Sequence, residues 1–178
     1  GAAVVLFFLA PVIAELLSSS APPVEFFNPF GFPVMCLLYG CGALLARELC
    51  ARWKKGWLGL LALGAAFAII EEGLMVRSFF DPGWPDLGIL ASHGRSLGVN
   101  WVWSLNLIIF HSVYSIMVPN ILVGLLFPSS RGEPWMGRAA LIVVCALFWI
   151  DVIVGGLMVT KYAPPLVPFL AAIALAGG

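Results

Sequence analysis

Long apolar stretches, separated by short polar or Pro-rich breaks, dominate the chain. Such stretches suit helices that cross a bilayer, because one span needs about 20 mostly apolar residues. The pattern predicts six spans, at about residues 2–17, 32–49, 57–80, 101–127, 139–160 and 165–178. The last one stops in mid-pattern and is expected to be incomplete. The predicted fold is therefore an all-α polytopic transmembrane bundle of five or six spans, forming one domain over residues 1–178.

Two of the connections between the spans are expected to form structure of their own. The segment "VEFFNPFGFP" (residues 24–33) is aromatic and Pro-rich, which is typical of an interfacial or re-entrant connection. Residues 81–100 are punctuated by Gly and Pro, and a loop this long usually serves a function. We expect it to form a partly helical cover over the outer ends of spans three and four, with Trp84 and Leu87 directed toward lipid. Pro119 is expected to kink span four.

Composition supports a membrane environment. The chain is 62% hydrophobic and 10% charged, whereas a soluble domain carries about 25% charged residues. The formal net charge is zero, which argues against a nucleic-acid partner. The expected partner is the lipid bilayer, and a homo-oligomer or a larger membrane complex stays open. The cysteines show no CxxC spacing and are expected to be free thiols: Cys36, Cys41, Cys50 and Cys145.

Lys and Arg are distributed unequally between the two sides of the predicted bundle. One side carries Arg47, Arg52, Lys54, Lys55, Arg131 and Arg138, and the other carries Arg77, Arg95 and Lys161. Basic loops usually stay in the cytoplasm, so the N-terminus is predicted to be cytoplasmic. The expected location is the plasma (inner) membrane.

Four ionisable residues fall deep inside predicted spans. Helical rise puts Glu71 and Glu72 roughly 12–14 Å from the outer end of span three, and His111 and Asp151 roughly 15 Å deep in spans four and five. An ionised group at this depth costs several kcal/mol unless it finds a partner. We therefore expect one shared interior site. Adjacent residues point about 100° apart on a helix, so only one of the two glutamates is expected to aim at its centre.

Further polar residues flank this layer. Ser104, His111 and Ser115 follow one helical stripe, whereas Asn106 lies off it. Ser115, Asn106 and Asp151 are expected to support the site. For the remaining ionisable residues, simpler roles are expected. Arg77 is expected to extend outward or to pair with Glu72 or Asp81, Glu15 to lie at the interface, and His93 to be solvated.

These residues leave three functions open. In an intramembrane hydrolase, Glu71 or Glu72 would be the general base that activates a water, and His111 would polarise that water or bind a metal. Asp151 would orient or ligate, so that a divalent metal would be held by Glu72, His111 and Asp151. In a proton or cation transporter, the same layer would relay protons or coordinate the ion. In a non-catalytic subunit or scaffold, it would only join helices.

The paired "EE" followed by Arg77, with His111 on the next long span, resembles the CAAX-protease-like (CPBP) intramembrane family. That family carries EExxxR on one helix and His/Asn motifs on later ones. The resemblance implies a metal-dependent or glutamate-based hydrolase, with Glu71, Glu72, Arg77 and His111 as matched positions. "EEGLMVR" has one residue more than the motif, and Phe110 directly precedes His111. No second His/Asn motif follows, so Asp151 would stand in for it.

Overall fold

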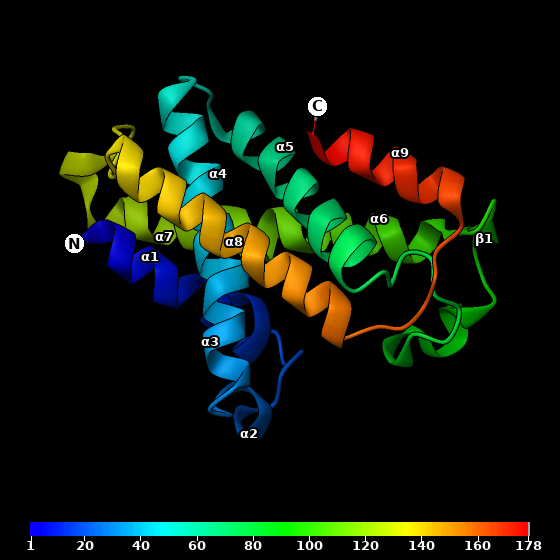
Figure 1. Ribbon diagram of the computed structural model, residues 1–178. Helices are drawn as coiled ribbons and strands as arrows, with labels where there is room; N and C mark the ends of the chain where they lie inside the picture. Colours follow the sequence, from blue (N-terminus) through cyan, green and yellow to red (C-terminus); the bar gives the residue numbers. More distant parts are fainter. Residues whose placement is uncertain (178) are drawn as a thin grey trace.

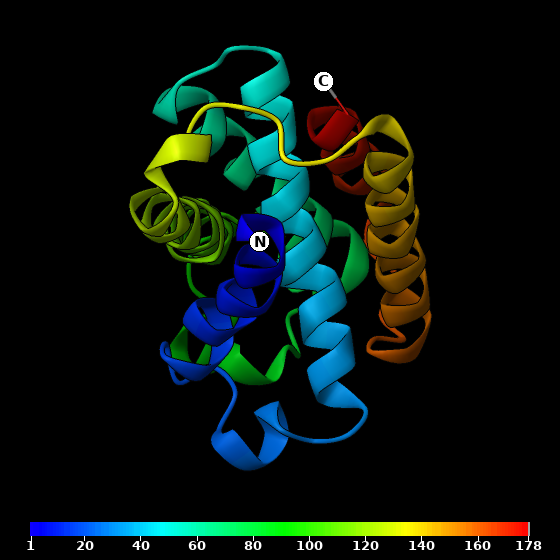
Figure 2. The ribbon, with the colours of Figure 1, turned by 90° about the vertical axis from the view of Figure 1, so that its left-hand side faces the viewer.

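Four long apolar helices build the protein. The computed structural model describes residues 1–177 and is mostly helical. Four of its helices are long and apolar enough to cross a membrane: Gly31–Arg52, Trp57–Met75, Trp101–Leu126 and Arg138–Met158. They comprise α3 (Gly31–Met35) with α4 (Cys41–Arg52), α5 (Trp57–Ala68), α6 (Trp101–Phe110) with α7 (Val118–Leu126), and α8 (Arg138–Met158). Figure 1 shows the α3–α4 helix crossing the α6–α7 helix steeply, and Figure 2 shows α8 packed beside α4.

Two shorter apolar helices complete the bundle. The N-terminal one contains α1 (Ala2–Pro11), and α9 (Leu166–Gly177) is the last. A helix of 15 residues reaches only about 22 Å, less than a hydrocarbon core of about 30 Å. The predicted first and sixth spans therefore exist as helices, while the number of complete crossings is four by length and composition. Residue 178 of the predicted sixth span lies outside the described residues.

Four helical stretches wind as π-helix, in which each N–H bonds five residues back. They are η1 (Val12–Leu16), η2 (Cys36–Gly40), η3 (Ile69–Met75) and η5 (His111–Met117). η1 continues α1, η2 joins α3 to α4, η3 continues α5, and η5 joins α6 to α7. Well under 1% of residues in globular proteins are π-helical, and such turns concentrate at functional sites. Pro119 is the second residue of α7, which follows η5, and it lacks the N–H that an α-helix would use there.

The helices of the structure begin and end near the limits of the predicted spans, except in span three. Its helix stops at Met75 instead of residue 80, because the chain turns at Arg77, which adopts a left-handed conformation with φ of 63°. The other helices begin and end within three residues of the predicted limits. The predicted connection over residues 24–33 contains the short helix α2 (Pro23–Phe26) and the start of α3.

Residues 81–100 fold back onto the bundle. They form the 3₁₀-helix η4 (Pro85–Ala91) and a two-stranded antiparallel ribbon of β1 (Arg95–Ser96) and β2 (Val99–Asn100). Asn100 fastens this segment to the helices: its N–H donates to the Phe79 carbonyl (2.8 Å) and its side chain caps Trp103 N–H (3.0 Å). The segment thus covers the start of α6, as expected. Leu87 is buried in the protein and does not face lipid.

Both basic loops lie together at one end of the bundle. Arg47 Nη2 donates to the carbonyls of Ser130 (3.1 Å) and Glu133 (2.6 Å), so the end of α4 holds the loop that follows the 3₁₀-turn η6 (Pro128–Ser130). Trp135 N–H donates to Glu48 Oε1 at 2.6 Å. The structure therefore joins the two loops that were predicted to share a side.

Gly64 allows α5 to approach η5 closely. A Cβ placed on Gly64 would lie 2.6 Å from the Cα of Ser112, a distance that real Cβ atoms do not show. The obstacle is backbone, so it cannot rotate away. This contact matters for the site, because it sets how near the helix of the two glutamates comes to the helix of His111.

We predict that Gly64→Ala lowers the apparent melting temperature of the detergent-purified protein. The added methyl group forces two helix backbones apart, which costs about 1–3 kcal/mol. Gly124→Ala is the matched control, since the nearest atom to its Cβ is 4.0 Å away, and it should be neutral or stabilising by up to about 1 kcal/mol through helix propensity. Equal melting temperatures for the two variants would contradict this packing.

Candidate functional site

The four π-helical stretches meet at one buried polar cluster. η1 supplies Glu15, η2 supplies Tyr39, η3 supplies Glu71 and Glu72, and η5 supplies His111. A π-turn inserts a residue into an α-helix and rotates the side chains that follow, so it can direct a polar group inward without moving the rest of the helix. Every π-helical stretch of the described chain therefore contributes to the same site.

His111 lies at the centre of this cluster. Its Nε2 is 3.3 Å from Glu72 Oε1, and its Nδ1 is 3.3 Å from Glu71 Oε2. Nδ1 also forms a 2.9 Å hydrogen bond with the hydroxyl of Ser115, one turn further along the helix. The imidazole is thus held at both edges. The convergence of Glu71, Glu72 and His111 agrees with the predicted shared layer.

Both glutamates reach the ring, which the sequence did not predict. We expected only one of two adjacent residues to aim at the centre. In the structure, Glu71 contacts one edge of the imidazole and Glu72 contacts the other. The His111 ring fits between two neighbouring side chains of one helix, so neither glutamate has to turn toward a different span.

Tyr39 and Glu15 extend the cluster on the side of Glu71. The Tyr39 hydroxyl lies within hydrogen-bond distance of both Glu15 Oε1 and Glu71 Oε1. A phenol has one hydrogen and donates it to one acceptor at a time. Tyr39 therefore links the two carboxyl groups through its single hydroxyl.

The sequence analysis did not select Tyr39 and assigned Glu15 to the interface. In the structure Glu15 is half-buried and hydrogen-bonded to Tyr39. The available signal was the lone tyrosine in the apolar run "CLLYGCG", whose hydroxyl needs a partner in lipid. Only the packing of the helices reveals that the partners are Glu15 and Glu71.

Ser78 continues the cluster on the side of Glu72. Its hydroxyl donates to Glu72 Oε2 and accepts a 3.0 Å hydrogen bond from Trp103 Nε1. Polar contacts therefore run without a break from Glu15 through Tyr39, Glu71, His111 and Glu72 to Ser78. This row joins the N-terminal helix to the turn that precedes the 81–100 segment.

The other predicted supporting residues lie outside the cluster, Ser115 excepted. Arg77 donates to the Tyr162 carbonyl at 2.7 Å and pairs with neither Glu72 nor Asp81. Asn106 is exposed on α6. Asp151 is buried on α8, but within residues 1–177 its Oδ2 has no hydrogen-bond partner, and it is not in the group of metal-ligand atoms. His93 is exposed in the covering segment, as expected.

The cluster contains more acidic than basic groups. Three carboxyl groups surround one imidazole, and in the described part of the chain no Lys or Arg forms an ion pair with Glu15, Glu71 or Glu72. Glu71 and His111 are almost completely buried. Uncompensated charge inside a bilayer is costly, so protons or a cation must balance the site.

The donor atoms suit a small divalent cation. Glu71, Glu72 and His111 each offer one ligand atom, and these three atoms lie within 4.8 Å of one another. Zn–N and Zn–O bonds of about 2.1 Å in a tetrahedral site separate neighbouring ligands by about 3.4 Å. The His111 Nε2 to Glu72 Oε1 distance is 3.3 Å. Glu71 Oε2 is buried 3.3 Å from His111 Nδ1 and forms no hydrogen bond, which leaves a lone pair available.

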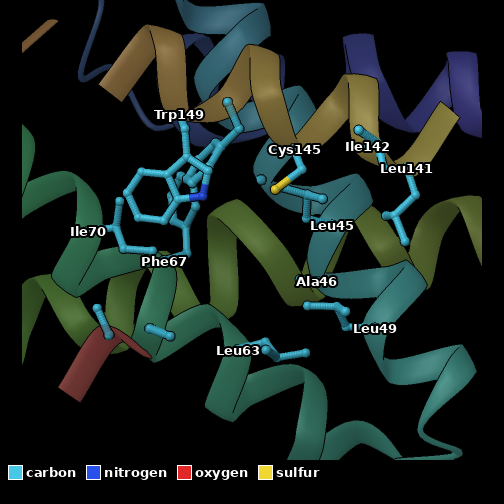
Figure 3. Close-up of a pocket in the computed structure, with 14 residues that line it drawn as sticks. Leu45, Ala46, Leu49, Leu63, Phe67, Ile70, Leu141, Ile142, Cys145 and Trp149 are labelled. Carbon is cyan, nitrogen blue, oxygen red and sulfur yellow. The ribbon is translucent and has the colours of Figure 1, made fainter. Parts of the chain in front are cut away.

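An apolar groove borders the cluster. Figure 3 shows side chains from α4, α5, η3 and α8 around this groove, with Phe67, Ile70, Cys145 and Trp149 among them. The cavity has a volume of about 400 Å³. Ile70 directly precedes Glu71 in the chain. The Phe67 ring centre lies 5.9 Å from that of His111, so Phe67 forms the wall between the groove and the site.

Comparisons with known proteins support the membrane assignment. An uncharacterized protein of Archaeoglobus fulgidus is 28% identical over 126 residues, which cover 70% of this chain and 38% of that protein. The chain thus spans well under half the length of this relative. No solved structure matches the chain significantly. The model of one family matches residues 4–177. The chain therefore belongs to this family, which is described as an uncharacterized membrane protein family.

Proposed function

We propose that the protein is a membrane-embedded, metal-dependent hydrolase whose centre is formed by Glu71, Glu72 and His111. The observation that carries this proposal is the close grouping of these three donors: their ligand atoms lie within 4.8 Å of one another, and no Lys or Arg of the described chain pairs with them. A divalent cation would offset the two carboxylates. The resemblance of the "EE", Arg and His pattern to the CPBP family points the same way.

The donor set fits a catalytic rather than a purely structural metal. Catalytic zinc sites use three protein ligands and leave one position open, whereas structural sites use four. The cluster offers three. When bound, such a cation acts as a Lewis acid on a water or a carbonyl group. The proposed substrate class is an amide or ester within an apolar chain.

The residues around the ligands have distinct roles in this proposal. The Ser115 hydroxyl holds Nδ1 of His111, which leaves Nε2 directed at Glu72 and the cation. Glu71 keeps one oxygen free for the cation, while the other contacts Tyr39. Glu15, as a carboxylate, would receive the proton of an attacking water by way of the Tyr39 hydroxyl, which passes its own proton to Glu15, and would return it to the leaving group along the same path.

A structural role is the second candidate. It is favoured by the number of elements that the cluster joins, since four helices supply its hydrogen bonds. In this case the polar contacts only hold the helices together, and their loss changes stability alone. The variants below separate the two functions.

We expect Glu72→Gln to abolish zinc binding and hydrolysis. The amide keeps the shape of the side chain and loses the charge that holds a cation. Zinc content by elemental mass spectrometry should fall from about one per chain to background after reconstitution. Cleavage of a quenched fluorescent apolar peptide in detergent should stop. Glu25→Gln, at an exposed position on α2, is the control. Unchanged zinc binding in Glu72→Gln would contradict the proposed centre, and a change in melting temperature alone would favour the structural role.

Tyr39→Phe is expected to lower the hydrolysis rate roughly 10- to 100-fold with zinc content unchanged, because it removes a proton carrier and not a ligand. Glu15→Gln should show a fall of the same kind, since its carboxyl lies behind the same hydroxyl. Rates equal to wild type in both variants would exclude the proton path. Loss of zinc in Tyr39→Phe would mean that the tyrosine is needed for the centre itself.

Cys145→Trp should test the groove as the substrate route. The indole would occupy part of the 400 Å³ cavity and should reduce kcat/KM for the apolar peptide about tenfold, with zinc content unaffected. Val143→Trp is the matched control, because Val143 lies on the same helix, is 56% exposed and does not line the groove. Equal effects of both substitutions would show that the substrate enters elsewhere.

A further inference from the structure

A second pocket lies away from the Glu/His cluster, at the end of the bundle that carries the basic loops. It encloses about 520 Å³ where the α4–α5 turn, α7 and the loop after η6 meet. Its charged lining is entirely basic and consists of Arg47, Lys54, Lys55 and Arg131. Trp57 and Trp135 also line it.

Most of this positive charge has no internal partner. Arg47 pairs with the fully buried Glu48 at 3.0 Å, and Arg52 shares that carboxylate at 3.3 Å. Lys54, Lys55 and Arg131 form no ion pair within residues 1–177. The pocket therefore presents three uncompensated cations around one cavity, which suits an anionic group.

The pocket is rigidly built rather than a chance meeting of flexible loops. The Arg47 guanidinium lies 3.3 Å from the centre of the Trp135 ring and donates to two carbonyls of the loop. Trp135 Nε1 donates to the Ser130 carbonyl at 2.9 Å. Lys54 closes the α4–α5 turn in a left-handed conformation, with φ of 52°. The backbone that carries Lys55 and Arg131 is thus fixed by bonds that do not use their own side chains.

One side of the pocket is apolar and continues onto the lipid-facing surface. Leu60 and Ile121 line it, and Leu58, Leu122 and Leu125 are exposed within four residues of them in sequence. Trp57 is exposed at the start of α5, a position typical of a tryptophan at the membrane interface. A ligand that fills this pocket needs an anionic head and apolar chains.

From this combination we infer that the pocket binds the phosphate headgroup of an anionic phospholipid. The phosphate would lie among Lys54, Lys55 and Arg131, and the acyl chains would follow Leu60 and Ile121 to the bilayer. Basic pockets between transmembrane helices on the cytoplasmic side bind anionic headgroups in this way. The inference does not depend on the Glu/His cluster or on hydrolysis.

Native mass spectrometry of the detergent-purified protein tests it, with phosphatidylglycerol as the probe. The Lys55→Gln/Arg131→Gln double variant should lose roughly 10- to 30-fold in affinity. The Arg138→Gln/Lys161→Gln double variant removes the same charge outside the pocket and should keep wild-type affinity. Melting temperature and zinc content should stay unchanged in both, so a failure here is distinct from a failure of the proposed metal centre.

Two further measurements distinguish binding of a lipid headgroup from binding of the acyl chains alone or of free phosphate. Phosphatidylcholine carries the same chains without net charge and should bind at least tenfold more weakly. Inorganic phosphate should not displace phosphatidylglycerol at millimolar concentration. Equal affinity for the two lipids, or equal losses in the two double variants, would overturn the inference. Displacement by inorganic phosphate would assign the pocket to a soluble phosphate and overturn the lipid assignment.

Discussion

The contact of His111 with two carboxylates is the constraint on which the arrangement of the helices depends. A buried imidazole and two buried glutamates are tolerable in lipid only if each one is partnered. The partners come from separate elements, so those elements must meet at one point. The approach of α5 to η5 across Gly64, the π-turns at each contributing helix and the inward Tyr39 all serve that meeting. If the contact is removed, these features lose their common explanation.

The sequence predicts much of the fold because span length and hydropathy are local properties. Five of the six helices match the predicted limits closely, and span three fails only where Arg77 takes a left-handed turn. The prediction of a shared layer for Glu71, Glu72 and His111 also follows from local depth. Depth alone could not predict that Tyr39 joins the cluster or that Asp151 lies outside it. Both results depend on the crossing angles and the rotation of the helices. π-turns change that rotation, and no residue pattern in the chain predicts them.

The two ends of the molecule balance charge by different means. At the basic end, Glu48 is fully buried but forms ion pairs with both Arg47 and Arg52. Its charge is therefore neutralised within the chain. At the Glu/His cluster no basic side chain of the described residues takes that role, and Arg77, the nearest one in sequence, binds a backbone carbonyl instead. The chain thus contains Arg–Glu pairs where a carboxylate needs only compensation. The lack of such a pair at Glu71 and Glu72 fits a site whose compensating charge comes from outside the chain.

Two protons or one divalent cation could supply the positive charge that balances Glu71 and Glu72. The two alternatives lead to different chemistry at the same atoms. Protons would turn Glu71 and Glu72 into donors, and the row from Glu15 to Ser78 would become a set of neutral hydrogen bonds that only joins helices. A cation would keep both carboxylates ionised, and the Tyr39 hydroxyl would then donate to either Glu15 or Glu71. The Tyr39 hydroxyl thus has a different role in the two arrangements: it is one link of a neutral network in the first, and in the second it is a donor that orients Glu71 as a ligand.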